Sequence, residues 1–393
     1  MNVFRRLSSR GLAVLLGAIA TFGVVAAVAT VAALGGGGTT PPAEPLAQAI
    51  HDGLSAAPVQ GVTARVTFTN NLLGSSALGS LAAGSGSPLL SGASGRIWLT
   101  NDGHLRLELQ SGSGDAQIVS DGKTLTVYDA SSNTAYELAL PAQGPDSTTP
   151  ADHAVPGLSE IDTALTQLES FATVSDAVPG STAGQPSYTV SVSPKANGGL
   201  VSSAELGWDA ATGVPLHAAI YAKGDTTPVL DLTVTDISYG PVASSDVNVT
   251  PPPGAKIETL SLPTAGTEKS GTPVTGLAAV AAAVPFTLAA PDTLDGLARN
   301  EVRLTGSGAD AGALVTYGEG LSTIAVLEHA PAAKDASSPL SMLPSVTING
   351  ATGHELVTAL GTIVHVTSGG VAYTIAGSVT QSDAESAARA LTS

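Results

Sequence analysis

The residues that could carry chemistry in this sequence are scattered, and few stand at a spacing that a reaction would need. There are seven histidines and no cysteine. His354-Glu355 opens like the zinc-binding pattern HExxH, but Thr358 stands where the second histidine ligand should be. A single histidine on a helix face cannot hold the metal. We find no close histidine pair on any expected helix or strand face, so we expect no metal site.

The other patterns of this kind fit turns better than catalysis. Residues 306–311, GSGADA, match the dinucleotide pattern GxGxxA, but that site needs a helix next, and residues 313–317 alternate like a strand. Several aspartates that might form a catalytic carboxylate pair fall at turns and strand ends, where aspartate stabilises local backbone. They are Asp102, Asp115, Asp121 and Asp129. The sequence has no GxSxG elbow and no P-loop. We therefore expect no catalytic residues, no cofactor and no enzyme.

The composition excludes further classes of protein. The 393 residues carry a net charge of −17, and only 12% of them are charged. An acidic, lysine-poor surface disfavours nucleic acid and anionic lipid headgroups, so attraction to a membrane has to be apolar. The lack of cysteine excludes disulfides, thiolate metal sites and a lipidated N-terminal cysteine.

The N-terminal segment has the features of a membrane anchor. Arginines occur within residues 1–10, and residues 11–34 carry no charge. That stretch is long enough to span a bilayer, and the positive flank predicts a cytoplasmic N-terminus with the bulk of the chain extracytoplasmic. The alternative is a signal peptide cleaved after Ala29 or Ala33, which would release a secreted protein. Residues 1–43 are therefore expected to form an anchor or signal segment with a glycine-rich stem.

Residues 95–140 organise the rest of the expected fold. Apolar and polar residues alternate there, most clearly in residues 105–109, LRLEL, as in a strand with one apolar face. The breaks at residues 101–103 (NDG) and 121–122 (DG) supply the positive φ of tight hairpins. The pattern predicts an antiparallel meander whose apolar face must be covered.

The flanking segments predict helices and more strands. We expect helices from Glu44 to Ala57 and from Leu158 to Phe171, where apolar residues recur at helical spacing. Three prolines at 251–253 should close this domain, because they cannot continue a sheet. Further strands are expected at 62–69, 188–193, 202–209, 216–223 and 229–237. In the last part of the chain, strands are expected at 301–305, 313–317, 322–328, 345–348, 362–367 and 371–376. A final helix should start at a capping box formed by Ser382 and Glu385.

Four segments, in order, resemble the LolA-like periplasmic lipoprotein carriers. They are IVSDGKTLTVYD (118–129), SPKANGGL (193–200), GWDAATGVPLHAAIYAK (207–223) and VNVTPPPGAKI (247–257). The resemblance covers about residues 44–257 and implies an α+β fold: an incomplete antiparallel β-barrel lidded by helices, whose concave face holds acyl chains. The domain order resembles the MucB/RseB regulators of extracytoplasmic sigma factors, which add a smaller C-terminal domain. The expected domains are 44–257, a linker at 258–283 and a small α+β domain at 284–393.

The resemblance places the candidate ligand-binding residues on the apolar face of the sheet. They are Ile97, Leu99, Leu105, Leu107, Leu109, Leu125, Val127, Tyr136, Leu138, Leu206, Trp208, Leu230 and Leu232. The alternative is that these side chains form an ordinary packed core. One departure from the family is that Asn101 or Asp102 stands where the carriers have an arginine that latches the lid, which puts regulated handover of lipoproteins in doubt.

Residues 70–94 form a long insertion rich in glycine and serine. Its leucines suggest a mobile apolar flap over the ligand or against a membrane, and the alternative is a loop with a few side chains tucked in. These leucines are Leu72, Leu73, Leu78, Leu81, Leu89 and Leu90.

The sequence as a whole indicates a membrane-anchored, extracytoplasmic, non-enzymatic protein. Its expected partners are lipid or lipoprotein acyl chains and the cytoplasmic membrane, through the N-terminal segment, without nucleic acid. Two alternatives stay open: an envelope-stress regulator of the MucB/RseB type that acts on a membrane regulatory protein, and a structural envelope protein without a ligand.

Overall fold

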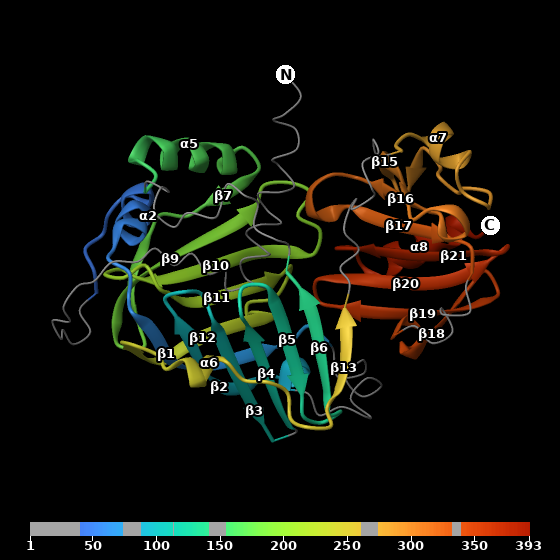
Figure 1. Cartoon of the computed structure of the whole chain (residues 1–393). Helices are drawn as coiled ribbons and strands as arrows, with labels where there is room; N and C mark the ends of the chain where they lie inside the picture. The colour runs from blue at the N-terminus through green and yellow to red at the C-terminus, as the bar shows by residue number, and fades with distance from the viewer. Residues whose placement is uncertain (1–39, 74–87, 113, 141–154, 261–273, 332–338) are drawn as a thin grey trace.

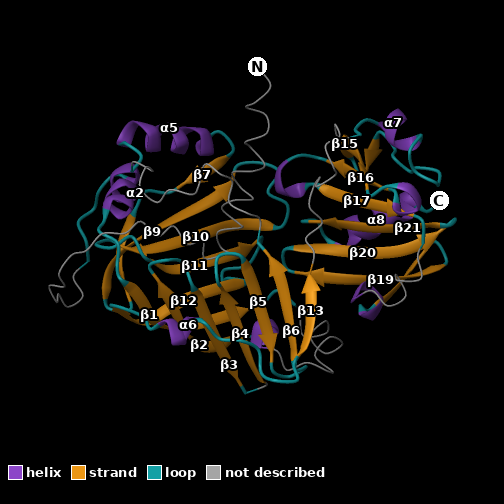
Figure 2. Cartoon of the chain, in the orientation of Figure 1, coloured by secondary structure: helices purple, strands orange, loops and turns teal. Residues whose placement is uncertain are grey.

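Two β-sheets with a few short helices make up the part of the chain that the computed structural model describes (Figures 1 and 2). That part is residues 40–73, 88–112, 114–140, 155–260, 274–331 and 339–393. The expected membrane segment at 11–34 lies outside it. Among the described helices, none is both long and apolar enough to cross a membrane.

The first sheet has thirteen strands and curls into a half-barrel. Its order is β13-β6-β5-β4-β3-β2-β1-β12-β11-β10-β9-β7, with β8 paired to β9. The first strands are β1 (Gly61–Asn70), β2 (Ala93–Thr100), β3 (Leu105–Ser111), β4 (Gly114–Ser120), β5 (Thr124–Asp129) and β6 (Thr134–Ala139). The others are β7 (Ala172–Val174), β8 (Val178–Thr182), β9 (Gln185–Pro194), β10 (Val201–Asp209), β11 (Pro215–Ala222), β12 (Leu230–Tyr239) and β13 (Lys256–Leu260). The expected antiparallel meander is confirmed, and its turns use Gly103 and Gly122 at φ of 87° and 79°.

The first sheet continues beyond the prolines at 251–253, which were expected to end it. We expected residues 251–253 to close the domain, but the chain turns there and then adds β13 in parallel beside β6. Proline is incompatible with the inside of a sheet, yet a proline-containing turn can lead into an edge strand. The segment expected as a linker, 258–283, accordingly holds the end of β13 and helix α7 (Leu277–Ala281).

The second sheet has eight strands in the order β14-β15-β16-β17-β21-β20-β19-β18. They are β14 (Thr293–Leu294), β15 (Leu297–Thr305), β16 (Gly312–Tyr317), β17 (Ile324–His329), β18 (Ser345–Ile348), β19 (Ala351–Thr358), β20 (Gly361–Ser368) and β21 (Val371–Gly377). The GSGADA segment forms the β15–β16 turn, as expected, with a single 3₁₀ turn at Gly308–Asp310. Strand β19 was not expected from the sequence.

Helices cover parts of each sheet. In the first unit they are α2 (Leu46–Ser55), α4 (Pro88–Ser91), α5 (Leu158–Glu169) and α6 (Ser244–Val247). Helix α8 (Gln381–Leu391) packs on the second sheet and buries alanines and Leu391 in its core. Its capping box uses Thr380 and Asp383 instead of the expected Ser382 and Glu385. The helix therefore starts earlier than expected, since a cap is chosen by backbone geometry as well as residue type.

The described ends of the 70–94 insertion are ordered and packed. Residues 88–91 form the short helix α4, so the expected mobile flap does not include them. Leu89 packs against the core of the first sheet, and the carbonyl of Leu72 accepts a hydrogen bond from Ala359 N at 2.8 Å. Leu78 and Leu81 lie outside the described residues, so the flap remains a hypothesis for that part alone.

The two sheets are in contact with each other. Leu321, Ala359 and Leu360 of the second unit pack against a small cluster of the first. That cluster consists of Val201, Ile220, Ala222 and Val229. Hydrogen bonds cross the same junction, from Leu200 N to Ser378 Oγ and from Ser322 N to Asn197 O, both at 2.9 Å.

Candidate functional site

Strand pairing gathers most of the candidate ligand-binding residues on one face of the first sheet. Ile97 lies opposite Leu107, and Leu99 opposite Leu105, in the β2–β3 pair. Because side chains two residues apart share a face, these residues and their neighbours across β4–β6 form a continuous apolar face. The side chains between them, such as Arg106, point to the opposite, polar face.

The middle of this face is core. Ile97 and Leu109 are buried with Val62, Ala64 and Val66 of β1 in one cluster. The other candidate residues that pack against this cluster are Leu99, Leu105, Leu107 and Leu232, and Leu89 of α4 joins them. At these positions the structure therefore shows an ordinary packed core, which was the alternative to a ligand-binding face.

The face continues beyond the core across β4, β5, β6 and β13. Pairing places Leu125 beside Leu138, and Val127 between Ile118 and Tyr136. Leu260 lies next to Leu138 in the parallel β13–β6 pair and is 47% exposed. We call Ile118, Leu125, Val127, Tyr136, Leu138 and Leu260 the apolar strip. None of the six packs against the hydrophobic clusters that the described residues form.

The remaining candidate residues serve other parts of the fold. Trp208 is buried against Tyr188 and Ala49 of α2. Leu206 is 38% exposed, and Leu230 packs against the cluster at the junction with the second sheet. Sequence reasoning missed Ile118 and Leu260; alternation in residues 116–120 could have revealed the first, whereas the second depends on the unexpected β13.

The helices that were expected to form a lid cover only one end of the sheet. Helix α2 packs on Tyr188, Val190 and Trp208, and α5 contacts α2 and β7. Figure 1 shows both helices beyond β9, at the end of the sheet opposite to β5, β6 and β13. Among the described helices, neither α2 nor α5 therefore lies over the apolar strip.

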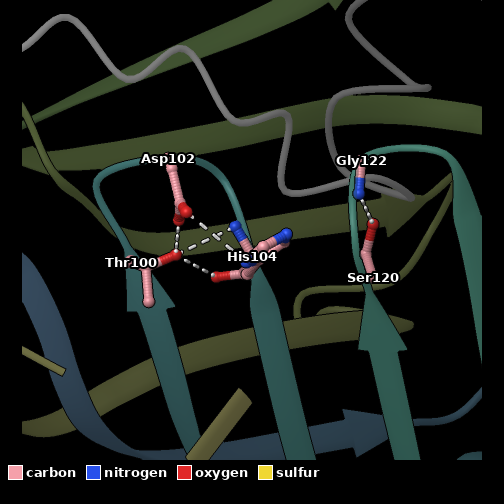
Figure 3. A network of polar contacts seen from close by, with 5 residues as sticks. All are labelled: Thr100, Asp102, His104, Ser120 and Gly122. Atoms are coloured by element: carbon pink, nitrogen blue, oxygen red, sulfur yellow. Dashed lines mark hydrogen bonds and ion pairs between the residues drawn. The ribbon is translucent and has the colours of Figure 1, made fainter. Parts of the chain in front are cut away.

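Three aspartates of the meander, Asp102, Asp121 and Asp129, form hydrogen bonds within their own turns, as expected. At the β2–β3 hairpin the Thr100 hydroxyl donates to Asp102, and His104 N donates to Thr100 Oγ1 at 3.0 Å (Figure 3). The Thr100 hydroxyl lowers the pKa of Asp102, with a smaller contribution from His104, whose Nδ1 is 3.5 Å away. Asp121 lies at the next turn, where it accepts from Lys123 N and Thr124 N at 2.9 and 2.6 Å. These carboxylates stabilise the two hairpin turns.

Two histidines become neighbours through strand pairing. His354 and His365 are direct partners across the β19–β20 pair, on two different strands. The pair was missed because β19 was not expected. Each ring has another partner, Leu343 O for His354 and Thr374 Oγ1 for His365, both at 2.9 Å. Among the described residues, no group of three or more histidine, cysteine, aspartate or glutamate side chains could hold a metal ion.

Comparison with known proteins finds similar solved structures but no match by sequence. No family model and no curated protein matches the sequence. The solved MucA/MucB complex of Pseudomonas aeruginosa is similar at 18% identity and a TM-score of 0.40, over 87% of this chain and 94% of that one. A LolA-superfamily protein from Nitrosomonas europaea is similar at 10% identity and a TM-score of 0.22, over 53% of this chain and 99% of that one.

These neighbours include the two kinds of protein that the sequence resembles, LolA-superfamily proteins and MucB. The expected fold class, a curled and incomplete antiparallel barrel with helices and a smaller second unit, is confirmed by the sheet topology itself. TM-scores of 0.40 and below decide nothing about function.

Proposed function

We propose that this protein is a non-enzymatic, extracytoplasmic binding protein that holds the acyl chain of a lipid or lipoprotein along the apolar strip. The observation that carries the proposal is the strip itself. It continues the apolar face of the sheet past the packed core, and Leu260 at its edge is 47% exposed. The other five members are half-buried. Apolar surface that stays accessible to solvent usually marks a binding site.

An acyl chain suits this surface better than a polar ligand. Each methylene removed from water contributes about 0.8 kcal/mol, so a chain lying along the strip gains affinity without directional contacts. The strip side chains offer few polar groups, Tyr136 being the exception. We further propose that residues 1–43 hold the protein at the membrane, where such a ligand is abundant.

The test is fluorescent fatty acid binding to residues 40–393. Val127→Glu should reduce binding at least about tenfold, because a carboxylate in the strip has to be desolvated. The matched control is Thr124→Glu, which adds the same charge to the same strand on the other face. Equal binding by both variants, each with an unchanged thermal midpoint, would exclude the strip as the site.

Native mass spectrometry of the same protein distinguishes the proposal from its alternatives. Co-purified lipid would support an acyl-chain binder. Protein without bound lipid would support the alternative of a structural envelope protein that has no ligand. Capture of a membrane regulatory protein without any bound lipid would favour a regulator of the MucB/RseB type.

A further inference from the structure

The polar face of the first sheet carries a hollow of about 570 Å³ over β1, β2 and β3. Its lining consists of Arg65, Ser94, Gly95, Arg96, Trp98, Arg106, Glu108 and Gln110. Alternation along the strands puts its charged side chains on the opposite face from the apolar strip. The hollow is therefore independent of the proposed acyl-chain site.

Two arginines face each other in this hollow. Arg65 of β1 and Arg96 of β2 are direct partners in the antiparallel register, and both are exposed. Side chains in such positions start about 5 Å apart at Cβ, and like charges there destabilise a sheet. Within the described residues, neither guanidinium forms an ion pair. This like-charge contact occurs in a chain whose net charge is −17.

Acidic residues lie beside the pair without neutralising it. Glu108 is the partner of Arg96 in the register, but its carboxylate accepts from Arg106 instead. Asp236 is opposite Arg65 on β12 and exposed, with no ion pair to it in the described part of the chain. In the described part of the chain, neither arginine has a carboxylate within ion-pair distance, so both guanidinium groups are open to an added anion.

Trp98 and Arg106 give the hollow a fixed wall. The guanidinium carbons of Arg106 and Arg96 lie 5.0 and 5.5 Å from the centroid of the Trp98 ring. Arg106 is also held by Glu108 and by the carbonyl of Asp246 in α6, at 3.1 Å. Because the indole ring already orients Arg96, less conformational entropy is lost when that guanidinium binds a ligand.

We propose that this hollow is a phosphate-binding site, with Arg65 and Arg96 as the two cations that take the phosphate oxygens. Guanidinium groups bind phosphate in bidentate geometry, and two of them balance the charge of a phosphate monoester dianion. A carboxylate would leave one arginine unmatched. The hollow has the size of a small-molecule site, so the phosphate would be carried by a larger group, either a soluble molecule or a lipid headgroup.

The test follows phosphate binding through tryptophan emission, using the full chain in a neutral detergent. The chain has two tryptophans, and the other one, Trp208, is buried in a separate cluster, so a response reports mainly on Trp98. The soluble probes are inorganic phosphate and glycerol 3-phosphate. The lipid probe is phosphatidic acid in the micelles, whose phosphate is a monoester, with diacylglycerol as the matched control that lacks the phosphate.

We expect Arg65→Gln and Arg96→Gln each to weaken binding about tenfold or more, since a hydrogen bond to a charged group is lost. Arg303→Gln, with the same change of charge on the second sheet, should bind like the wild type. Added sodium chloride should weaken binding by the wild type. Val127→Glu should leave phosphate binding unchanged, so this site and the apolar strip can fail separately.

The response to the probes shows whether the hollow binds phosphate and from which source. A response to soluble phosphates supports the site with a soluble ligand, and a response to phosphatidic acid alone supports it with a lipid headgroup. No response to any probe overturns the proposal, as does equal binding by Arg65→Gln and the wild type. Arg65→Gln without phosphate should keep or raise the thermal midpoint, because it removes a like-charge contact; a lower midpoint would assign Arg65 to the fold and overturn the proposal as well.

Discussion

At the scale of single residues, Glu328 is the least ordinary side chain in the second sheet. It is fully buried, and its Oε2 accepts from Ala289 N at 2.9 Å. Its Oε1 has no hydrogen-bond partner among the described residues. Burial raises the pKa of Glu328 to about 7 from an ordinary value of 4.5. The neutral acid is the form that this core accommodates, since an unpaired buried charge is costly.

This residue makes stability depend on pH. The folded state binds the Glu328 proton more tightly than the unfolded state, so stability is lost as the pH rises from about 4.5 through 7. The shift corresponds to about 3 kcal/mol between pH 4 and pH 8. We expect Glu328→Gln to remove that dependence, because glutamine has nearly the same shape and stays neutral. Urea unfolding of both proteins at several pH values measures it, and identical pH profiles for the two would contradict the assignment.

At the scale of elements, α8 shows how a cap decides where a helix begins. Thr380 Oγ1 accepts from Asp383 N, and Asp383 Oδ2 accepts from Thr380 N, both at 3.3 Å. We expect Thr380→Ala to cost about 1 kcal/mol of unfolding free energy. Ser382→Ala, at the position that the sequence suggested for the cap, should change stability by less than about 0.5 kcal/mol. Thermal unfolding of the two variants tests this, and the opposite ranking would mean that the helix starts at Ser382.

At the scale of the whole molecule, the junction between the sheets bears on whether each unit folds alone. We predict that residues 40–262, cut after β13 instead of within it, fold without the rest of the chain, because every strand of the first sheet is retained. The fragment should be less stable than the same unit in the full chain. Removal of the second unit exposes Val201, Ile220, Ala222 and Val229 to water.

Circular dichroism and urea unfolding of the fragment measure both parts of this prediction. A folded fragment with a lower midpoint than the full chain is the expected result. An unfolded fragment would show that the two sheets form one cooperative unit. The close fit at Gly199 supports a specific junction: its φ is +58°, and a Cβ there would lie 2.4 Å from Ser378 O.

Alternation in the sequence was enough to predict the strands of the meander and the face that each of their side chains takes. Alternation in residues 105–109 sets Leu107 and Arg106 on opposite faces whatever the surroundings, because a strand repeats every two residues. The hairpin turns at Gly103 and Gly122 could also be predicted from neighbouring residues alone, since these turns need glycine for positive φ. The apolar face and the half-barrel class followed from these local features and from the resemblance to LolA-like proteins.

Which parts of that face belong to the packed core depends on the tertiary structure. Leu107 and Val127 have the same pattern in sequence, yet Leu107 packs against the core cluster of the first sheet, whereas Val127 lies in the apolar strip. The pairing of Arg65 with Arg96, and of His354 with His365, likewise depends on which strands become neighbours. Alternation fixes the face of a residue but not its cross-strand partner, because that partner comes from a distant segment, and its register is set by the packing of the whole sheet.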